Sequence, residues 1–160
     1  MSEVTVRPMT QSEFDHWQAA LAEDFAAEQV AVGGWAKDGS VQRARDSNAD
    51  LLPLGLNTPR MLILWGIDSD GESVGRAWVG LDHPRGAPDT GFLYDIEVVE
   101  ERRGEGLGRG LLEAVEHAAL EAGVHALELN VFGTNGVAVA LYESSGYSVS
   151  TQQMRKTLRS

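Results

Sequence analysis

A run of residues at positions 102–110, Arg-Arg-Gly-Glu-Gly-Leu-Gly-Arg-Gly, has the composition of an anion-binding loop. Glycine has no Cβ, so its backbone can approach a ligand closely. The backbone N–H groups at the start of a helix have no partner inside that helix, and they suit a phosphate group. Arginines beside them add charge-assisted hydrogen bonds. The run therefore predicts a loop that holds a pyrophosphate.

The elements beside this loop must place it. An apolar run from Phe92 to Val99 precedes it, and a helical pattern from Leu111 to Ala122 follows it. Gly123 stands where a helix often ends on a left-handed glycine. A strand, a basic glycine loop and a helix N-terminus in this order form a phosphate clamp.

The rest of the chain alternates between strand and helix patterns. The expected elements are a strand at 4–8, a helix capped by Ser12 and ending near residue 30, a helix at 37–52, two strands at 61–67 and 73–81 joined by the turn Asp68-Ser69-Asp70-Gly71, a strand at 91–99, the helix at 111–122, a strand at 124–132, a helix at 137–144 and one or two strands at 147–158. This order predicts an α/β fold in one domain, residues 1–160, with an antiparallel front and a strand–helix–strand unit behind.

Composition excludes several kinds of site. The chain has no cysteine, which removes disulfides, thiolate metal sites and a cysteine nucleophile. Its histidines, His16, His83, His117 and His125, are scattered without metal-ligand spacing, so no metal site is expected.

Charge and hydropathy bound the partners. The net charge of −11 argues against nucleic-acid binding and is compatible with a cationic substrate. No apolar run reaches the roughly 20 residues of a membrane helix. The first residues show no apolar signal-peptide core. We therefore expect a soluble, cytoplasmic protein that binds neither nucleic acid nor a membrane.

Two common pyrophosphate sites fit the loop poorly. A P-loop ends in Gly-Lys-Ser/Thr, whereas here Gly108 is followed by Arg109 and a glycine. A dinucleotide loop needs a third small residue, where this chain has Arg109 or Leu111. Glu128 lies near the place of the acidic residue in dinucleotide folds, which leaves that alternative open, although the repeated strand–helix units are absent.

A third alternative is coenzyme A. The segment from Arg103 to Gly108 resembles the Arg/Gln-x-x-Gly-x-Gly/Ala motif of the GNAT superfamily of acetyl-CoA-dependent N-acetyltransferases. Residues 135–147, Asn-Gly-Val-Ala-Val-Ala-Leu-Tyr-Glu-Ser-Ser-Gly-Tyr, are similar to a second block of that family. The resemblance is clear from about residue 60 onward. It implies a mixed central sheet with helices on both faces.

The resemblance also implies a site for acetyl-CoA, with no metal. Backbone N–H groups of the loop would bind the pyrophosphate, the preceding strand would contact the pantetheine arm, and Asn135 would contact the cofactor or cap its helix. The residues concerned are Val98, Val99, Arg103, Gly104, Glu105, Gly106, Leu107, Gly108, Arg109 and Asn135. Glu105 is unusual here, because an acidic side chain near a phosphate is unfavourable unless it points away.

For catalysis, Tyr142 matches the family's general acid, which protonates the departing thiolate. Asp95 and Glu97 lie two apart, on one face of their strand, and are candidates for the general base. Several relatives carry an acidic residue just before Asp95, where this chain has Tyr94. That departure keeps a non-catalytic CoA-binding or sensor module as the alternative to acetyl transfer.

Position alone suggests where the acceptor amine binds. Phe25, Trp35 and residues 54–59 follow or end the first helices, which shape the acceptor pocket in the family. The acceptor is expected to be a primary amine on a peptide, a lysine, a polyamine or a small molecule. Dimers are common among relatives, so a homodimer is also an expectation.

Overall fold

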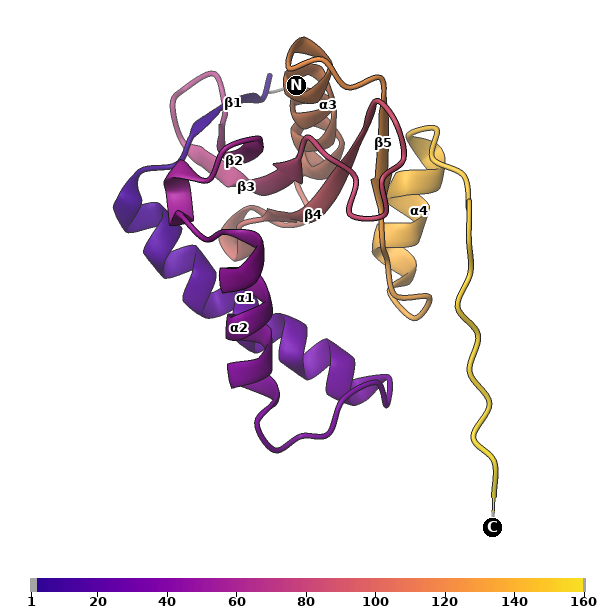
Figure 1. Cartoon of the computed structure of the whole chain (residues 1–160). Helices are drawn as coiled ribbons and strands as arrows, with labels where there is room; N and C mark the ends of the chain where they lie inside the picture. The colour runs from indigo at the N-terminus through magenta and orange to yellow at the C-terminus, as the bar shows by residue number, and fades with distance from the viewer. Residues whose placement is uncertain (1–2, 160) are drawn as a thin grey trace. The chain divides into compact units, whose positions relative to one another are not determined.

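The computed structural model describes residues 3–159 (Figure 1). The chain forms two compact units, Met1–Leu129 and Asn130–Ser160, and each is described by itself. The expectation of one domain over residues 1–160 stays a prediction. Within the described residues, no helix is long and apolar enough to cross a membrane.

The first unit is built on a five-stranded sheet in the order β1-β2-β3-β4-β5. Its strands are β1 (Thr5–Pro8), β2 (Met61–Ile67), β3 (Ser73–Gly80), β4 (Thr90–Val98) and β5 (Ala126–Leu129). The first four strands pair antiparallel with their neighbours, whereas β4 and β5 are parallel. This is the predicted antiparallel front joined to a strand–helix–strand unit.

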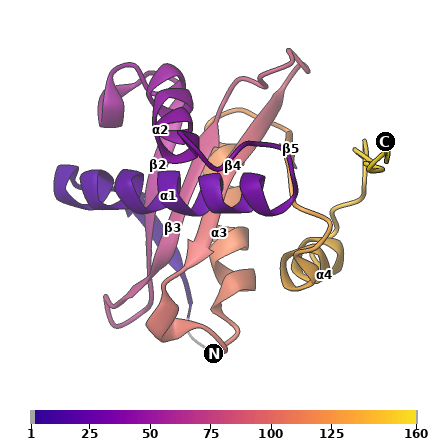
Figure 2. The ribbon, with the colours of Figure 1, turned by 90° about the horizontal axis from the view of Figure 1, so that it is seen from below.

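Helices cover both faces of this sheet, as expected. The helices are α1 (Gln11–Ala31), α2 (Ser40–Leu51) and α3 (Leu107–Glu121), with short 3₁₀ turns η1 (Gly55–Asn57) and η2 (Glu100–Arg102). Figure 2 shows α1 and α2 on one face of the strands and α3 on the other. The predicted fold class, a mixed sheet flanked by helices, is confirmed.

The start of α1 differs from the prediction because a better cap lies two residues earlier. The Thr10 hydroxyl accepts from the Glu13 N–H, and the Glu13 carboxylate accepts from the Thr10 N–H, which makes a reciprocal capping box. Ser12, the expected cap, is inside the helix. Arg7 at the end of β1 donates to both carboxylate oxygens of Glu13, at 2.9 Å each, and so ties the strand to the helix.

Aromatic rings fill the layer between the sheet and α1. Trp17 and Trp78 are each 2% exposed, and their ring centroids lie 5.7 Å apart in an edge-to-face contact. Phe14 contacts Trp17, and Tyr94 stacks on Trp78 at 4.5 Å. These ring contacts pack α1 against β3 and β4.

On the opposite face, two glycines let α3 lie close to the sheet. Gly66 and Gly75 are partners across β2 and β3, and the fully buried Leu111 of α3 sits over both. A Cβ on Gly66 would meet Leu111 at 2.6 Å, and a Cβ on Gly75 would meet the carbonyl oxygen of Glu97 at 2.1 Å. The glycine pair therefore sets the height of α3, and with it the position of the loop before α3.

The second unit holds α4 (Gly136–Ser144) and the end of the chain. Asn135 caps α4 by accepting from the Ala138 N–H at 3.2 Å. The expected strands at 147–158 are wrong, since none of the described residues after α4 forms a helix or a strand. A strand needs a partner strand, and residues 147–158 pair with no strand among the residues that the structure describes.

Candidate active site

The site begins where β4 parts from β5. The two strands pair only from Thr90 opposite Ala126 to Leu93 opposite Leu129. Beyond Leu93, β4 continues to Val98 with no paired strand on that side among the described residues. An unpaired strand edge presents backbone donors and acceptors to a ligand.

The direction of each backbone group along this free edge follows from one hydrogen bond. The Val99 N–H donates to the Val74 carbonyl of β3 at 2.9 Å. Because successive residues of a strand point to opposite edges, Val98 and Ile96 face the free edge. The prediction for Val98 agrees with this direction. The Val99 N–H, in contrast, already donates to β3. The sequence predicts Ile96 as a core residue rather than a cofactor contact, whereas its backbone groups face the free edge.

The glycine loop leads from this edge into α3. Gly104 and Gly106 have φ values of 82° and 76°, in the left-handed region that glycine alone adopts readily. Gly106 is the N-cap residue and offers no side-chain hydrogen bond, so the first N–H groups of α3 have no side-chain cap. The helix begins at Leu107, four residues earlier than expected, because Leu107 is buried and belongs to the core. The loop's last residues are thus the first turn of α3.

The negative side chain of Glu105, which is unusual in a phosphate-binding loop, forms an ion pair with an arginine of the same run. Its carboxylate accepts from Arg102 Nε at 3.1 Å, and Arg102 Nη2 also contacts Asp68 Oδ2 at 3.0 Å. Arg102 therefore links the loop to the turn between β2 and β3. The Glu105 carboxylate is thus held beside the Arg102 guanidinium. Its hydrogen bond, together with that of Asp68, raises the pKa of Arg102.

A β-bulge at Tyr94 arranges the neighbouring side chains. Val79 opposes Leu93 and Trp78 opposes Asp95, which leaves Tyr94 as an extra residue in β4. Tyr94 and Asp95 are adjacent in sequence, and a regular strand would point them to opposite faces. With the bulge, both contact the aromatic layer under α1. Burial raises the pKa of the Tyr94 phenol.

Asp95 and Glu97, the two predicted carboxylates, do share one face, and Arg76 of β3 joins them. Its Nε donates to Asp95 Oδ2 at 2.8 Å and its Nη2 donates to Glu97 Oε2 at 2.7 Å. Trp17 Nε1 donates to the same Asp95 oxygen at 2.9 Å. Glu97 also pairs with Arg103, whose Nε donates to the Val98 carbonyl at 3.3 Å. The carboxylates are therefore connected directly to the glycine loop, through partners that the sequence did not reveal.

Further acidic groups lie around this pair. Burial raises the pKa of Glu28 on α1, and the charges of Asp24, Glu97 and Asp95 raise it further. A group that senses three negative neighbours lies in a region of negative potential. Arg76 and Arg103 pair with Asp95 and Glu97 and offset part of this negative charge.

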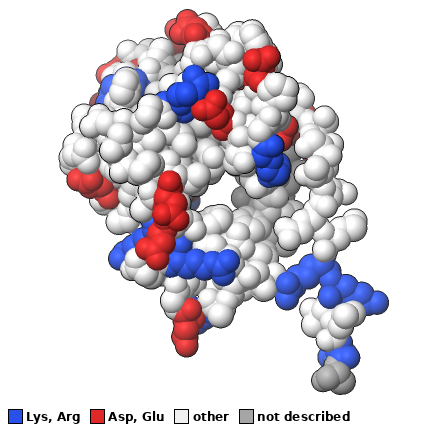
Figure 3. Space-filling view, viewed as in Figure 1, with Lys and Arg blue, Asp and Glu red and all other residues white. Residues whose placement is uncertain are grey.

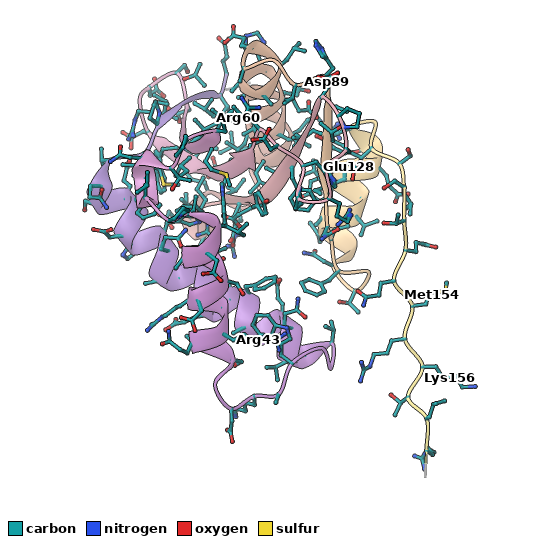
Figure 4. The ribbon with its side chains drawn as sticks, in the orientation of Figure 1. Arg43, Arg60, Asp89, Glu128, Met154 and Lys156 are labelled. Atoms are coloured by element: carbon teal, nitrogen blue, oxygen red, sulfur yellow. The ribbon has the colours of Figure 1, made fainter. Side chains whose placement is uncertain are left out.

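A second carboxylate couple involves β5. The Arg85 N–H donates to His83 Nδ1 at 3.0 Å, so His83 carries its proton on Nε2 and donates it to Glu128 Oε1 at 2.8 Å. His83 is buried against Phe92, and its side chain is 2% exposed. Figure 4 labels Glu128 on β5. Glu128 is thus a hydrogen-bonded partner of His83. Within residues 3–159, no group of His, Cys, Asp or Glu could hold a metal.

The residues expected to shape the acceptor pocket lie at the far ends of α1 and α2. Phe25 and Trp35 meet edge to face at 5.4 Å, and the Arg43 guanidinium lies 4.2 Å from the Trp35 ring (Figure 4). These contacts order the connection between the two helices. Residues 54–59 form η1 and its flanks, with Leu54 largely exposed.

In the second unit, Tyr142 lies on α4 and its ring contacts Tyr147 at 5.7 Å, edge to face. The Tyr147 N–H donates to the Tyr142 carbonyl at 3.0 Å, past the left-handed Gly146 that ends the helix. Asn135 is the helix cap described above. The general-acid role of Tyr142 and the cofactor contact of Asn135 remain predictions.

The elements that build this site all lie within the match to one protein-family model. The model of the acetyltransferase (GNAT) family matches residues 14–147, a range that spans the open edge, the glycine loop and α4. The chain belongs to the GNAT family. It is therefore an acetyltransferase that acts on an amine, and the prediction of family and enzyme class is confirmed.

Two relatives of this GNAT chain come from Bacillus subtilis (strain 168). YdgE and YycN, both named as uncharacterised N-acetyltransferases, are 30% and 31% identical to it. The alignments cover 96% and 97% of this chain and 98% and 99% of theirs. The crystal structure of YycN matches with a TM-score of 0.91 at 29% identity, over 98% of this chain and 99% of that one. These full-length enzyme relatives favour catalysis over a binding module.

More distant GNAT structures share the fold. A PaiA N-acetyltransferase from Thermoplasma acidophilum, solved in complex with coenzyme A, matches with a TM-score of 0.66 at 16% identity. That match covers 94% of this chain and 93% of PaiA.

Proposed function

We propose that this chain transfers the acetyl group of acetyl-CoA to a primary amine by direct attack of the amine. The observation that carries this proposal is the continuity of the free edge of β4 with the glycine loop and the start of α3. Such an edge can pair with the amide-bearing pantetheine arm, and the loop can bind a pyrophosphate. With no cysteine in the chain, an acetyl-thioenzyme has no residue on which to form.

The proposed cofactor contacts follow the backbone. Ile96 and Val98 would pair with the amides of the arm. The N–H groups of residues 103–109 would contact the pyrophosphate, with the positive end of the α3 dipole behind them. Arg103 contacts Glu97 and Val98 and lies at the start of this loop, so its guanidinium is placed to meet the anion.

For the acceptor, we propose an amine on a molecule with further positive charge. Four carboxylates, those of Asp24, Glu28, Asp95 and Glu97, lie near one another on the face between α1 and β4, and they outnumber the two arginines that pair with them, Arg76 and Arg103. Arg76 and Trp17 both contact Asp95 through Oδ2, and among the described residues no donor contacts Oδ1. That oxygen could accept from the amine, or from a water that takes the amine's proton.

For the leaving group, we propose Tyr142 as the general acid. Expulsion of the thiolate needs a proton, and a phenol can supply it. Asn135, besides its role as a cap, is proposed to contact the cofactor. The support for both is the family motif in residues 135–147. The cytoplasmic location expected from the sequence also stays a proposal.

Calorimetry with CoA tests the cofactor step, and an amine panel read by thiol release tests transfer. The chain has no cysteine, so a thiol reagent detects released CoA without a protein background. We expect CoA binding and turnover of at least one polyamine or basic peptide. A protein that binds no CoA would refute the proposal.

Paired variants test the individual roles with the best substrate. Tyr142→Phe should lower kcat with CoA affinity unchanged, whereas Tyr147→Phe, its ring neighbour, is the matched control. Turnover by Tyr142→Phe equal to that of the wild type across pH would show that Tyr142 is not the general acid.

Glu28→Gln should raise the acceptor KM about fivefold, as expected for the ~1 kcal/mol of a partly exposed charge pair. Glu23→Gln on the same helix should leave the acceptor KM unchanged. Equal KM values would argue against a cationic acceptor.

A further inference from the structure

Arg76 of β3 is a largely buried cation at the candidate active site. Its side chain is 16% exposed, and the Asp95 side chain that it contacts is 12% exposed. Arginine pairs at the surface differ: Arg60 and Asp82, 2.7 Å apart, are 58% and 70% exposed. Figure 3 shows blue and red side chains next to one another on the face that it draws. A charge is costly to bury unless it is paired and hydrogen-bonded. The carboxylates around Arg76 therefore set its position.

The Arg76 guanidinium joins two carboxylates that no other side chain joins in the described part of the chain. In the register of β3 and β4, Arg76 lies opposite Glu97, and Trp78 lies opposite Asp95. The Arg76 Nε donates to Asp95 Oδ2 at 2.8 Å, and its Nη2 donates to Glu97 Oε2 at 2.7 Å. The planar fork of an arginine spans two acceptors, whereas a lysine ammonium is a point charge on a flexible stem. Arg76 thus fixes the two carboxylates relative to one another.

These contacts also decide which oxygen of Asp95 stays open. Trp17 Nε1 donates to Oδ2 as well, at 2.9 Å, so both donors meet the same oxygen. Among the described residues, no donor contacts Oδ1. The terminal torsion of an aspartate has a broad range, so the two donors, rather than an intrinsic preference, hold the carboxylate in this orientation. Oδ1 is left to accept from a bound amine or a water.

Arg76 also limits the negative charge of this face. Four carboxylates and two arginines, Arg76 and Arg103, give the face between α1 and β4 a formal charge of −2. Without Arg76, the four carboxylates and Arg103 alone would give −3. A face with more negative charge attracts a cationic amine more strongly. Arg76 therefore weakens the attraction for the acceptor while it orients the carboxylate.

We propose that Arg76 is a positioning residue that holds Asp95 with Oδ1 open to the attacking amine, and that it does so with a loss of acceptor affinity. The inference rests on the proposed function, in which Asp95 accepts from the amine or from a water. An interaction that orients a group for the reaction raises kcat, whereas uniform attraction of the substrate lowers KM. Removal of Arg76 should therefore lower kcat and the acceptor KM together, a combination that a merely structural role would not produce.

Kinetics of two variants, with the best amine of the panel, test this combination. Arg76→Gln removes the charge. It should lower kcat about tenfold, the size of a lost hydrogen bond to a charged group, and lower the acceptor KM about threefold, within the range of a partly exposed ion pair. Arg76→Lys keeps the charge but reaches only one carboxylate, so kcat should fall while KM stays near that of the wild type. Arg60→Gln, at the position labelled in Figure 4, removes the exposed pair with Asp82 and should change neither constant.

Calorimetry with spermidine, without acetyl-CoA, measures the charge effect apart from catalysis. Spermidine should bind Arg76→Gln about threefold more tightly than the wild type, and circular dichroism should show that both variants fold. An acceptor KM for folded Arg76→Gln that equals or exceeds that of the wild type overturns the proposal. If Arg76→Gln does not fold, Arg76→Lys decides, because a wild-type kcat in this variant also overturns the proposal. A wild-type chain that acetylates no amine would instead refute the proposed function.

Discussion

The ion pair between Arg7 and Glu13 ties β1 to the start of α1, and replacement of Glu13 by Gln tests what this link contributes. Side-chain hydrogen bonds from Arg7, together with one from the Thr10 N–H, lower the pKa of Glu13 from 4.5 to about 2, against the opposing effect of burial. Gln can still accept from the Thr10 N–H, so the substitution removes the charge and leaves most of the cap. The change therefore isolates the ion pair.

The size of the effect follows from the shifted pKa. At ~1.36 kcal/mol per pKa unit, the difference between 4.5 and about 2 corresponds to about 3 kcal/mol of stability. The Arg7 side chain is 40% exposed, so water screens the pair. We therefore expect Glu13→Gln to lower the free energy of unfolding by about 1–2 kcal/mol at neutral pH.

The sign of the pH dependence is fixed, because the pKa is lowered in the folded state. The stabilisation is fully present above pH 4.5 and is lost as the pH falls toward about 2. Urea unfolding of the wild type and of Glu13→Gln at low salt, between pH 7 and pH 3, should show two curves that converge as the pH falls. Glu23→Gln, on the exposed side of the same helix, should follow the wild type. A deficit that stays constant with pH, or no deficit at pH 7, would refute the reasoning.

Three further predictions, the first with a matched control substitution, test the site and the residues that support it. Gly75→Ala should lower the free energy of unfolding by more than about 2 kcal/mol, since the new Cβ would meet a carbonyl oxygen at 2.1 Å; Gly71→Ala, in open space at φ 81°, should cost only about 1–2 kcal/mol. Gly106→Ala should weaken CoA binding about tenfold in calorimetry, because the left-handed loop disfavours a Cβ by about 1–2 kcal/mol, and unchanged affinity would count against the loop. Trp17→Phe removes one donor from Asp95, so acceptor kcat/KM should fall while CoA affinity stays the same.

Much of the framework was visible in the sequence because local chemistry decides it. The turn Asp68–Gly71, the run of β2 and the glycine loop were predicted from neighbouring residues alone, and the two GNAT motifs identified the family. The cap of α1 was placed at Ser12 rather than Thr10. The decisive signal there was the reciprocal pairing of Thr10 with Glu13, three residues on.

The arrangement inside the site was not visible, because it depends on contacts between distant segments. Arg76 and Trp17 reach Asp95 from another strand and a helix, and nothing in their local sequence marks them. The bulge at Tyr94 carries no glycine or proline to indicate it. Residues 147–158 show the opposite error. Their composition favours a strand, but a strand forms only when it can pair with the edge of another strand.

Tyr94 is a residue that the sheet itself does not require. Without it, Leu93 and Asp95 would oppose Val79 and Trp78 in uninterrupted register, and β4 would be an ordinary strand. An uninterrupted β4 could keep pairing with its parallel neighbour past Leu93, which would cover the backbone groups that a cofactor needs. Tyr94 therefore interrupts the β3–β4 pairing and at the same time packs on Trp78 and Phe92, so one inserted residue contributes both to the irregular strand and to the aromatic layer.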